Sequence, residues 1–268
     1  MPDIQLPDLI KSASDAAQSN IPATIEQTDG ALSTIVGFFN NVVLYPVKKA
    51  NITFQYKLEA FKDDMAKKIK NIPPEHLQEP PVMIAGPALE ALRYAYDEKE
   101  LREMYENLLA SAMDNRVSSE AHPSFVDTIK QLSPLDAIVL SMFATKQQYK
   151  CGTIYFNLTE DSSKNYANAM PDYFVEEFCL LGEPFLVSTA IINLKRLGIV
   201  DITEGALTGE DYNSMKSNQY VTNREQLYRQ RGAYDFIVKI NEHALVLNNY
   251  GKQFIKICLP KGGQINAN

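Results

Sequence analysis

The sequence predicts a mainly helical α+β protein, in which a helical N-terminal region is followed by a region that mixes helices with short strands. Two observations carry this prediction. Apolar residues recur every three or four positions over most of residues 50–148, which is the spacing of amphipathic helices. Beyond that point, short runs rich in β-branched and aromatic residues appear at 153–158, 199–203 and 234–247, and such runs are typical of strands.

The N-terminal segment divides into a polar arm and an apolar run. Residues 1–30 contain three prolines, and we expect them to form a flexible arm. The run 31–47, ALSTIVGFFNNVVLYPV, is the most apolar stretch of the chain, and Asn40 and Asn41 interrupt it. Because 17 residues is at the short end for a membrane span, we expect a helix that is buried against other helices. A segment that lies on a membrane surface stays open as the alternative.

A basic amphipathic helix is predicted next, from about residue 50 to residue 71. Its apolar positions recur at three- and four-residue steps, and Pro73 and Pro74 follow its end. Seven lysines and three acidic residues lie between Lys48 and Lys70. Such a charge run usually forms a solvated face, but beside an apolar run it also suits a membrane surface. Residues 31–70 therefore define a membrane-surface alternative for the function.

The stretch 79–136 is the densest series of helix starts and stops, and it predicts four short helices packed on one another. Gly86-Pro87 is expected to open the first, because proline is tolerated in a first turn. Asp97 can cap the second, with Glu100 completing a capping box. His122-Pro123 precedes the third, and Ser133-Pro134 begins the fourth.

This stretch also carries a family resemblance. The runs IAGPALEALRYAYDEKELREMYENLLASAMD and AHPSFVDTIKQLSPLD resemble the bacterial abortive-infection alpha family, and the resemblance continues into NLKRLGIV and NYGKQFIKIC. It covers about Lys48 to Leu259 and implies a mainly helical bacterial protein that is associated with phage defence. The resemblance supplies no active-site residues. The motif positions to which it gives no role are Gly86, Pro87, Leu108, Leu109, Ser111, His122 and Pro123.

The C-terminal half is predicted to be a winged-helix-like region over 133–260, after a helical region over 31–132 and before a disordered tail at 261–268. The order helix, strand, helix, helix, strand, insertion, strand is that of a winged helix. We expect a helix from Pro134 to about residue 148 and a hairpin around Asn241–His243. The other expected elements are strands at 153–158 and 199–203 and helices at 173–181, from Ser188, and at 250–259.

Charge argues against a general nucleic-acid binder. The chain carries a formal charge of −7, and residues 133–268 contain 13 basic and 14 acidic residues. The helix that would enter a DNA groove offers only Asn193, Lys195 and Arg196, while the insertion concentrates Arg224, Arg229 and Arg231. Because phosphate binding requires a basic stripe, nucleic acid is disfavoured as a partner, and we expect the winged-helix-like region to pack against protein.

Cysteine and histidine usage gives no sign of a metal or cofactor. Cys151, Cys179 and Cys258 are widely spaced, and no CxxC pair or HExxH motif occurs. We therefore expect neither a disulfide framework nor a metal site, and no cofactor. The first ten residues lack the basic region of a signal peptide, which fits a cytoplasmic protein.

One pair of residues offers weak catalytic potential. Arg116 and His122 have five residues between them at a helix–loop–helix junction, and this spacing resembles that of HEPN-type ribonucleases. His122 would act as general acid or base and Arg116 would stabilise phosphate charge. The pattern is short enough to arise by chance, and a capping role before Pro123 explains His122 equally.

The sequence thus favours a non-enzymatic, cytoplasmic protein that acts in phage defence through protein contacts. Its partner is not identified by the residues, and 14 tyrosines would suit self-association into a homo-oligomer. Two alternatives stay open. One is a membrane-surface effector that uses residues 31–70, and the other is a ribonuclease that uses Arg116 and His122.

Overall fold

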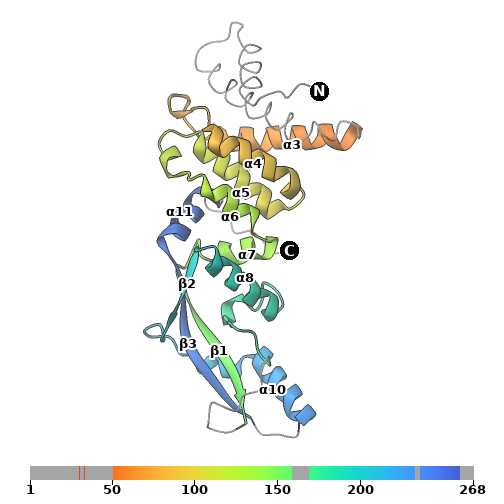
Figure 1. Cartoon of the computed structure of the whole chain (residues 1–268), viewed down its shortest axis with the longest axis vertical. Helices are drawn as coiled ribbons and strands as arrows, with labels where there is room; N and C mark the ends of the chain where they lie inside the picture. The colour runs from red at the N-terminus through yellow and green to blue at the C-terminus, as the bar shows by residue number, and fades with distance from the viewer. Residues whose placement is uncertain (1–29, 31–32, 34–50, 159–168, 233–235, 260–268) are drawn as a thin grey trace. The chain divides into compact units, whose positions relative to one another are not determined.

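The computed structural model describes residues 30, 33, 51–158, 169–232 and 236–259 (Figure 1). Contacts divide the chain into two compact units. Unit 1 comprises Met1–Gln131 with Ile257–Lys261, and unit 2 comprises Leu132–Lys256 with Gly262–Asn268. The predicted arm, the tail and all but two residues of the segment 30–50 lie outside the described residues, so the expectations for them stay predictions.

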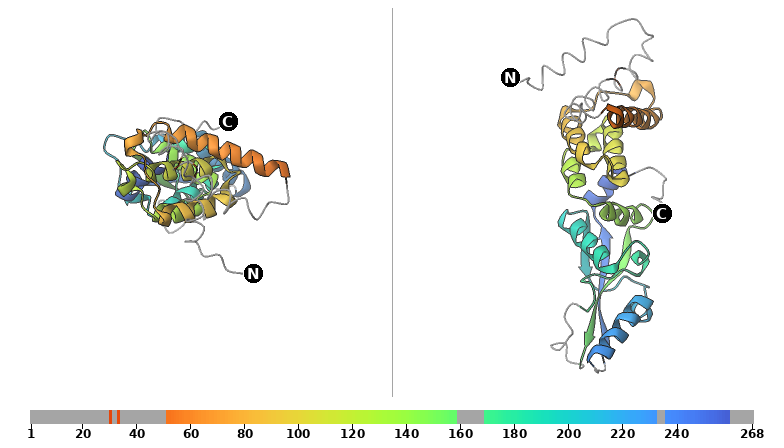
Figure 2. Two further views of the ribbon diagram at one scale, coloured as in Figure 1. Left: turned by 90° about the horizontal axis from the view of Figure 1, so that it is seen from above. Right: turned by 90° about the vertical axis from the view of Figure 1, so that its right-hand side faces the viewer.

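Unit 1 is a group of helices arranged around α5. Helix α5 packs against α3, α4 and α6, and its inward side chains, among them Leu108 and Leu109, are fully buried (Figures 1 and 2). The regular elements are α3 (Asn51–Ile69), α4 (Val82–Ala95), α5 (Lys99–Ala112) and α6 (Ser124–Lys130), with 3-10 turns at Pro74–His76 and Ser118–Glu120. The prediction of a helical region is confirmed over this part of the chain.

Two helix starts in unit 1 differ from the prediction. Helix α4 begins at Val82, so Gly86 and Pro87 lie inside it rather than at its start. Proline removes the N–H that would bond the carbonyl of Met83, but Met83 is 71% exposed and water can replace that bond. Helix α5 begins after Glu98 without a side-chain cap. Asp97 forms an ion pair with Lys57 of α3 at 2.7 Å instead of capping the helix.

Unit 2 combines a three-stranded antiparallel sheet with helices. The strand order is β1-β3-β2 (Figure 1). Strand β1 pairs with β3 over its full length, from Gln148↔Val246 to Asn157↔Ile237, whereas β2 pairs only with the last five residues of β3. The elements are α7 (Pro134–Met142), β1 (Gln148–Asn157), α8 (Pro184–Arg196), β2 (Val200–Glu204), α9 (Ser214–Ser217), α10 (Gln219–Gly232), β3 (Ile237–Leu247) and α11 (Asn249–Cys258).

The two-stranded part of the sheet has a hydrophobic core of its own. One face of the β1–β3 ribbon is covered by the insertion between β2 and β3, and α10 lies beside the ribbon in Figure 1 and in the right-hand view of Figure 2. A Cβ at Gly152 would come within 2.9 Å of side-chain atoms of Ile240 and Met215, so glycine lets α9 approach the ribbon closely. The buried members of this core are Ile154, Phe156, Ala169, Met170, Phe174, Tyr212, Met215, Val221 and Phe236.

Two predicted elements of unit 2 and the start of a third are wrong. The hairpin around Asn241–His243 is one continuous strand, because β1 supplies a partner for each of these residues. The helix at 173–181 is reduced to a 3-10 turn at Glu176–Phe178, because Phe174 pairs with Gly152 instead. Helix α8 begins after Glu183, whose carboxylate accepts the N–H groups of Phe185 and Leu186.

The Ser133-Pro134 helix start is confirmed. The Ser133 hydroxyl accepts the N–H of Asp136 at 3.2 Å, and the Asp136 carboxylate accepts the N–H of Ser133 at 2.6 Å. These two bonds form a complete capping box for α7. The mainly helical α+β class is likewise confirmed, with strands restricted to unit 2 in the described part of the chain.

Candidate functional site

An open groove in unit 2 gathers polar side chains from four segments. Its volume is about 430 Å³. Strand register explains part of its composition: Cys151 lies opposite His243, and Thr153 is two residues further along β1, so Thr153 and His243 share one face of the sheet. We call this hollow the α8 groove, and its lining consists of Thr153, Asp172, Tyr173, Ile192, Lys195 and His243.

Hydrogen bonds in the groove fix the tautomer of His243. The Thr153 hydroxyl donates its only proton to the carbonyl of Asp172 at 2.8 Å. The same oxygen lies 3.1 Å from Nε2 of His243, so it accepts the Nε2–H of the ring. In the neutral ring Nδ1 is then an acceptor, and it is buried without a hydrogen-bond partner among the described residues. The groove therefore contains one buried acceptor that no described side chain satisfies.

Helix α8 forms the other wall of the groove. The ammonium of Lys195 lies 3.5 Å from the Tyr173 hydroxyl and 5.6 Å from the centre of its ring. Ile192, one turn earlier on the helix, is 39% exposed. Lys195 also belongs to the last turn of α8, where the helix dipole favours a cation. The lining thus combines one cation, one anion in Asp172, an aromatic ring and an apolar side chain.

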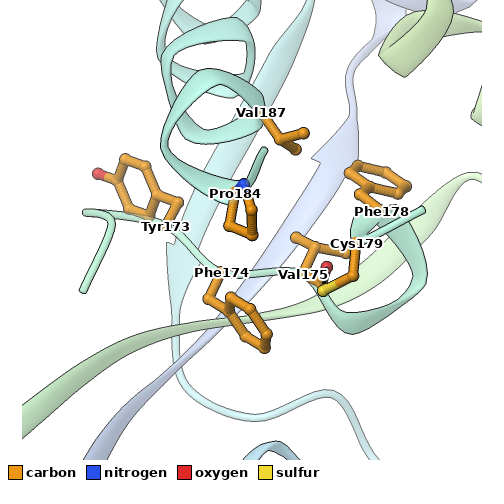
Figure 3. A pocket seen from close by; sticks show the side chains of 7 residues that line it. All are labelled: Tyr173, Phe174, Val175, Phe178, Cys179, Pro184 and Val187. Carbon is orange, nitrogen blue, oxygen red and sulfur yellow. Dashed lines mark hydrogen bonds between the residues drawn. The ribbon is translucent and has the colours of Figure 1, made fainter. Parts of the chain in front are cut away.

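A second, smaller hollow lies beside the groove but has no capacity for a ligand. Figure 3 shows its lining, in which the Tyr173 ring points away from Phe178 and Cys179. Its volume is about 10 Å³, at the lower limit for a single water. The Cys179 thiol is directed to the carbonyl of Val175 at 3.7 Å, and burial raises its pKa. We interpret this hollow as a packing gap.

The three residues on α8 that the sequence predicts as possible nucleic-acid contacts do not form one common surface. The Asn193 amide donates to Asp136 at 2.9 Å, and its oxygen accepts two bonds from Arg196, at 3.1 and 2.7 Å. Only Lys195 of the three lines the α8 groove. In the insertion, Arg224 donates twice to the carbonyl of Ala169, and Arg229 pairs with Glu225 at 2.6 Å. These contacts leave Arg231 as the exposed arginine of α10.

Arg116 and His122 each have a structural partner in unit 1. The Arg116 guanidinium donates to both carboxylate oxygens of Asp114, at 2.8 and 2.6 Å. These hydrogen bonds hold the pKa of Asp114 below its usual range. His122 Nδ1 accepts the N–H of Ser124, the first residue of α6, at 3.1 Å and lies 2.7 Å from its hydroxyl. Both residues thus stabilise the loop and helix start that they flank.

Among the remaining motif positions, Ser111 has a clear contact with a described residue and Gly86 has none, and Asn107 on the same helix as Ser111 makes a similar contact. Ser111 donates to the carbonyl of Ile257 at 3.2 Å, and Asn107 donates to that of Cys258 at 3.0 Å. Both bonds satisfy carbonyls in the last turn of α11, which lack partners within their own helix. Gly86 has no neighbouring atom that a Cβ would meet. The structure therefore offers no packing reason for glycine at that position.

Sequence reasoning found one residue of the α8 groove, Lys195, and missed the other five. They come from strand β1, the loop before the 3-10 turn, helix α8 and strand β3, and no linear motif joins them. The period-two alternation around Thr153 and His243 is a signal that could have placed them on one face. In the described part of the chain, no group of three or more His, Cys, Asp or Glu side chains is arranged to hold a metal ion.

The fold and the groove define a two-unit protein with a helical first unit and an open, mixed-polarity groove in its α+β second unit. The family model for abortive infection alpha matches residues 53–258, so the chain belongs to that family. No curated protein and no solved structure matches the chain. Among the described helices, none is both long and apolar enough to cross a membrane.

Proposed function

We propose that the chain is a phage-defence component that acts by binding a protein segment in the α8 groove. The observation that carries this proposal is the lining of the groove, where an exposed cation, an exposed anion and an apolar side chain surround a volume of about 430 Å³. The family assignment supplies the biological setting. The mixed polarity of the groove supports recognition of a protein segment as the mode of action.

The charge balance of the groove favours protein over nucleic acid. Lys195 and Asp172 contribute one charge of each sign, so a polyanion would meet repulsion as well as attraction. A peptide offers both charged groups and apolar side chains, and Ile192 provides an apolar contact beside the charges.

The topology of unit 2 supports a winged-helix-like interpretation of this surface. The order α7, β1, α8, β2, β3 with sheet order β1-β3-β2 resembles that of a winged helix, although a 3-10 turn at Glu176–Phe178 stands in place of one helix and the α9–α10 insertion lies between the last two strands. In DNA-binding members of that fold, the helix that corresponds to α8 enters the major groove. Here Asn193 and Arg196 are engaged with each other and with Asp136, so the helix has few groups free to contact bases.

The test compares variants of the full chain in a host where the wild-type chain lowers the plating efficiency of a phage. Lys195→Glu and Ile192→Asp should abolish that protection, since they reverse the cation and remove the apolar contact. Lys216→Glu is the matched control, because Lys216 is an exposed lysine on α9 outside the groove. Equal protection by all four proteins would contradict the proposal.

Crosslinking identifies the class of partner. A photoreactive residue at position 192 should yield a discrete protein adduct during infection. The identified partner, purified, should bind the wild type and Lys216→Glu but not Lys195→Glu. A nuclease-sensitive adduct would instead show that the groove binds nucleic acid and would overturn the choice of a protein partner.

A further inference from the structure

Unit 1 buries a carboxylate that its basic neighbours do not satisfy. Glu106 lies on the inward face of α5 and is 1% exposed. The nearest cations are the ammonium of Lys68, 3.7 Å from Oε2, and Nε of Arg102, 3.8 Å from Oε1. Both distances exceed hydrogen-bond length. Oε1 is buried and has no hydrogen-bond partner in the described part of the structure.

Both cations donate elsewhere. Lys68 donates to the amide oxygen of Asn107 at 2.7 Å. Arg102 donates to the carbonyl of Tyr96 at 2.7 Å, and its guanidinium lies 5.2 Å from the centre of the Tyr96 ring. The geometry is therefore arranged around an uncharged Glu106, because an ionised carboxylate at this depth would require donors directed at it.

The other charges near Glu106 also oppose its ionisation. Burial raises its pKa to about 7, and Asp64 of α3 and Glu103 of α5 add to the rise against the opposing effect of Lys68 and Arg102. Helices α4 and α6 present apolar or hydroxyl side chains to the core. The returning segment Ile257–Leu259 brings no charged side chain. The group thus changes charge close to neutral pH.

Asn107 links this carboxylate to the end of α11. Its side-chain oxygen accepts from Lys68, and its side-chain nitrogen donates to the carbonyl of Cys258 at 3.0 Å. Residues Ile257–Lys261 belong to unit 1, although the rest of α11 belongs to unit 2. The amide of Asn107 therefore binds the segment with which the chain returns to unit 1.

We propose that Glu106 is a proton-operated latch for the returning segment Ile257–Leu259. When the carboxyl is protonated, Lys68 fixes the Asn107 amide, and the amide holds Cys258. When the carboxyl ionises, Lys68 is the nearest available donor and moves to it. Asn107 then loses the bond that orients its amide, and its hold on Cys258 weakens. A rise in pH towards neutrality thereby releases the end of α11 from α5.

The sign of the pH dependence follows from linkage. The pKa of Glu106 in the folded chain, about 7, lies above the ordinary value of 4.5. In the closed state, Asn107 holds Cys258, and in the open state it does not. Protonation of Glu106 stabilises the closed state over the open state fully below about pH 4.5. This stabilisation declines as pH rises to about 7 and is gone above it. Across that window, the opening equilibrium increases by up to about tenfold per pH unit.

Cysteine labelling of the full chain tests the latch. Cys258 and Cys151 are both fully buried, and they belong to units 1 and 2 respectively, so Cys151 is an internal control. We would measure the modification rate of each thiol by mass spectrometry between pH 5.5 and pH 8. The intrinsic reactivity of thiols rises with pH for both, and taking the ratio of the two rates removes that common effect.

The expected result is a ratio of Cys258 to Cys151 labelling that rises with pH in the wild type and stays flat in Glu106→Gln, where the amide mimics the protonated acid. A flat ratio in the wild type overturns the proposal, whether or not the variant folds. Hydrogen exchange provides a second criterion. If amides of α6 exchange as fast as those of Ile257–Leu259, unit 1 opens as a whole and there is no local latch.

Discussion

The two units each contain a buried or half-buried glutamate beside a lysine, yet the pKa values of the two carboxyls shift in opposite directions. Glu106 in unit 1 lies 3.7 Å from Lys68, whereas Glu176 in unit 2 lies 2.6 Å from Lys150. Burial alone would raise both pKa values. For Glu176, hydrogen bonds from Lys150 and Ser214 outweigh burial and lower the pKa, while that of Glu106 rises to about 7.

Two things distinguish the acids: Glu106 is the more deeply buried, and only Glu176 receives hydrogen bonds from its described neighbours. The Ser214 hydroxyl donates to Glu176 at 2.7 Å and lies 2.6 Å from the ammonium of Lys150, which also donates to the carbonyl of Asp211. Every member of that cluster has a partner. The cluster in unit 2 therefore fastens α9 to β1, whereas the one in unit 1 stays responsive to pH.

The largest change in stability is expected from breaking the hydrogen-bonded cluster of Lys150, Glu176 and Ser214 in unit 2. Lys150→Met leaves Glu176 without its cation, and because the two side chains are only 11% and 19% exposed, the free energy of unfolding should fall by about 3 kcal/mol at pH 7. Urea unfolding followed by circular dichroism measures it. Lys146→Met is the control, because its ion pair with Glu177 is 42% and 33% exposed and should be worth less than about 1 kcal/mol. Similar losses in the two variants would contradict this account.

The next largest change in stability is expected at Glu106, the buried acid that lacks a hydrogen-bond donor among the described residues. Glu106→Gln should be more stable than the wild type by roughly 2 kcal/mol at pH 8, and this advantage should shrink as pH falls towards the ordinary pKa of a glutamate. The reason is that the folded wild type must ionise a buried carboxyl above about pH 7. Unfolding curves at several pH values check the trend. An advantage that does not change with pH would show that Glu106 is already ionised when folded.

A smaller loss of stability should follow from weakening the cluster of Lys150, Glu176 and Ser214. Ser214→Ala removes one hydrogen bond to Glu176 and should cost about 1 kcal/mol at pH 7. Because the pKa of Glu176 is lowered in the folded chain, its stabilisation is present above the ordinary pKa and is lost as pH falls through the folded value. The variant should lose less stability on acidification than the wild type does. If the variant and the wild type lose the same stability on acidification, Ser214 does not have the proposed role.

The smallest effect is expected at His122. Replacing it by alanine removes the acceptor for the Ser124 N–H at the start of α6 and should lower the free energy of unfolding by about 0.5–1 kcal/mol. Phage protection should persist, because the proposed function does not use this residue. Loss of protection in a variant of normal stability, together with loss of an RNA-cleaving activity, would instead favour the ribonuclease alternative.

The sequence predicted those elements whose signals are local. Ser133, Pro134 and Asp136 determine a helix start through bonds within four residues, and that start is confirmed. The sequence around β3 predicts a hairpin because Asn241 and Glu242 look like a turn, but their pairing depends on β1, almost 90 residues earlier. Likewise Asp97 looks like a cap, but Lys57 of another helix takes its carboxylate.

The α8 groove could not be found by the same reasoning. Its members become neighbours only through the pairing of β1 with β3 and the packing of α8 on the sheet, and these are long-range contacts. Lys195 is predictable as a contact residue because a basic side chain on a helix that could enter a DNA groove is visible in the sequence. His243 was not, since an isolated histidine carries no spacing signal, and its importance lies in a bond to Thr153 from another strand.

Unit 1 is built from two chain segments that are synthesised at different times. Asn107 and Ser111 leave the ribosome early, but the carbonyls that they bind belong to Ile257 and Cys258. The 125 residues of Leu132–Lys256 are made in between. At about 5–20 residues per second, this interval lasts roughly 6–25 seconds. The helices of unit 1 therefore wait for that interval before Ile257 and Cys258 are made, whereas the sheet of unit 2 cannot form until its central strand β3, which ends at Leu247, has been made shortly before them.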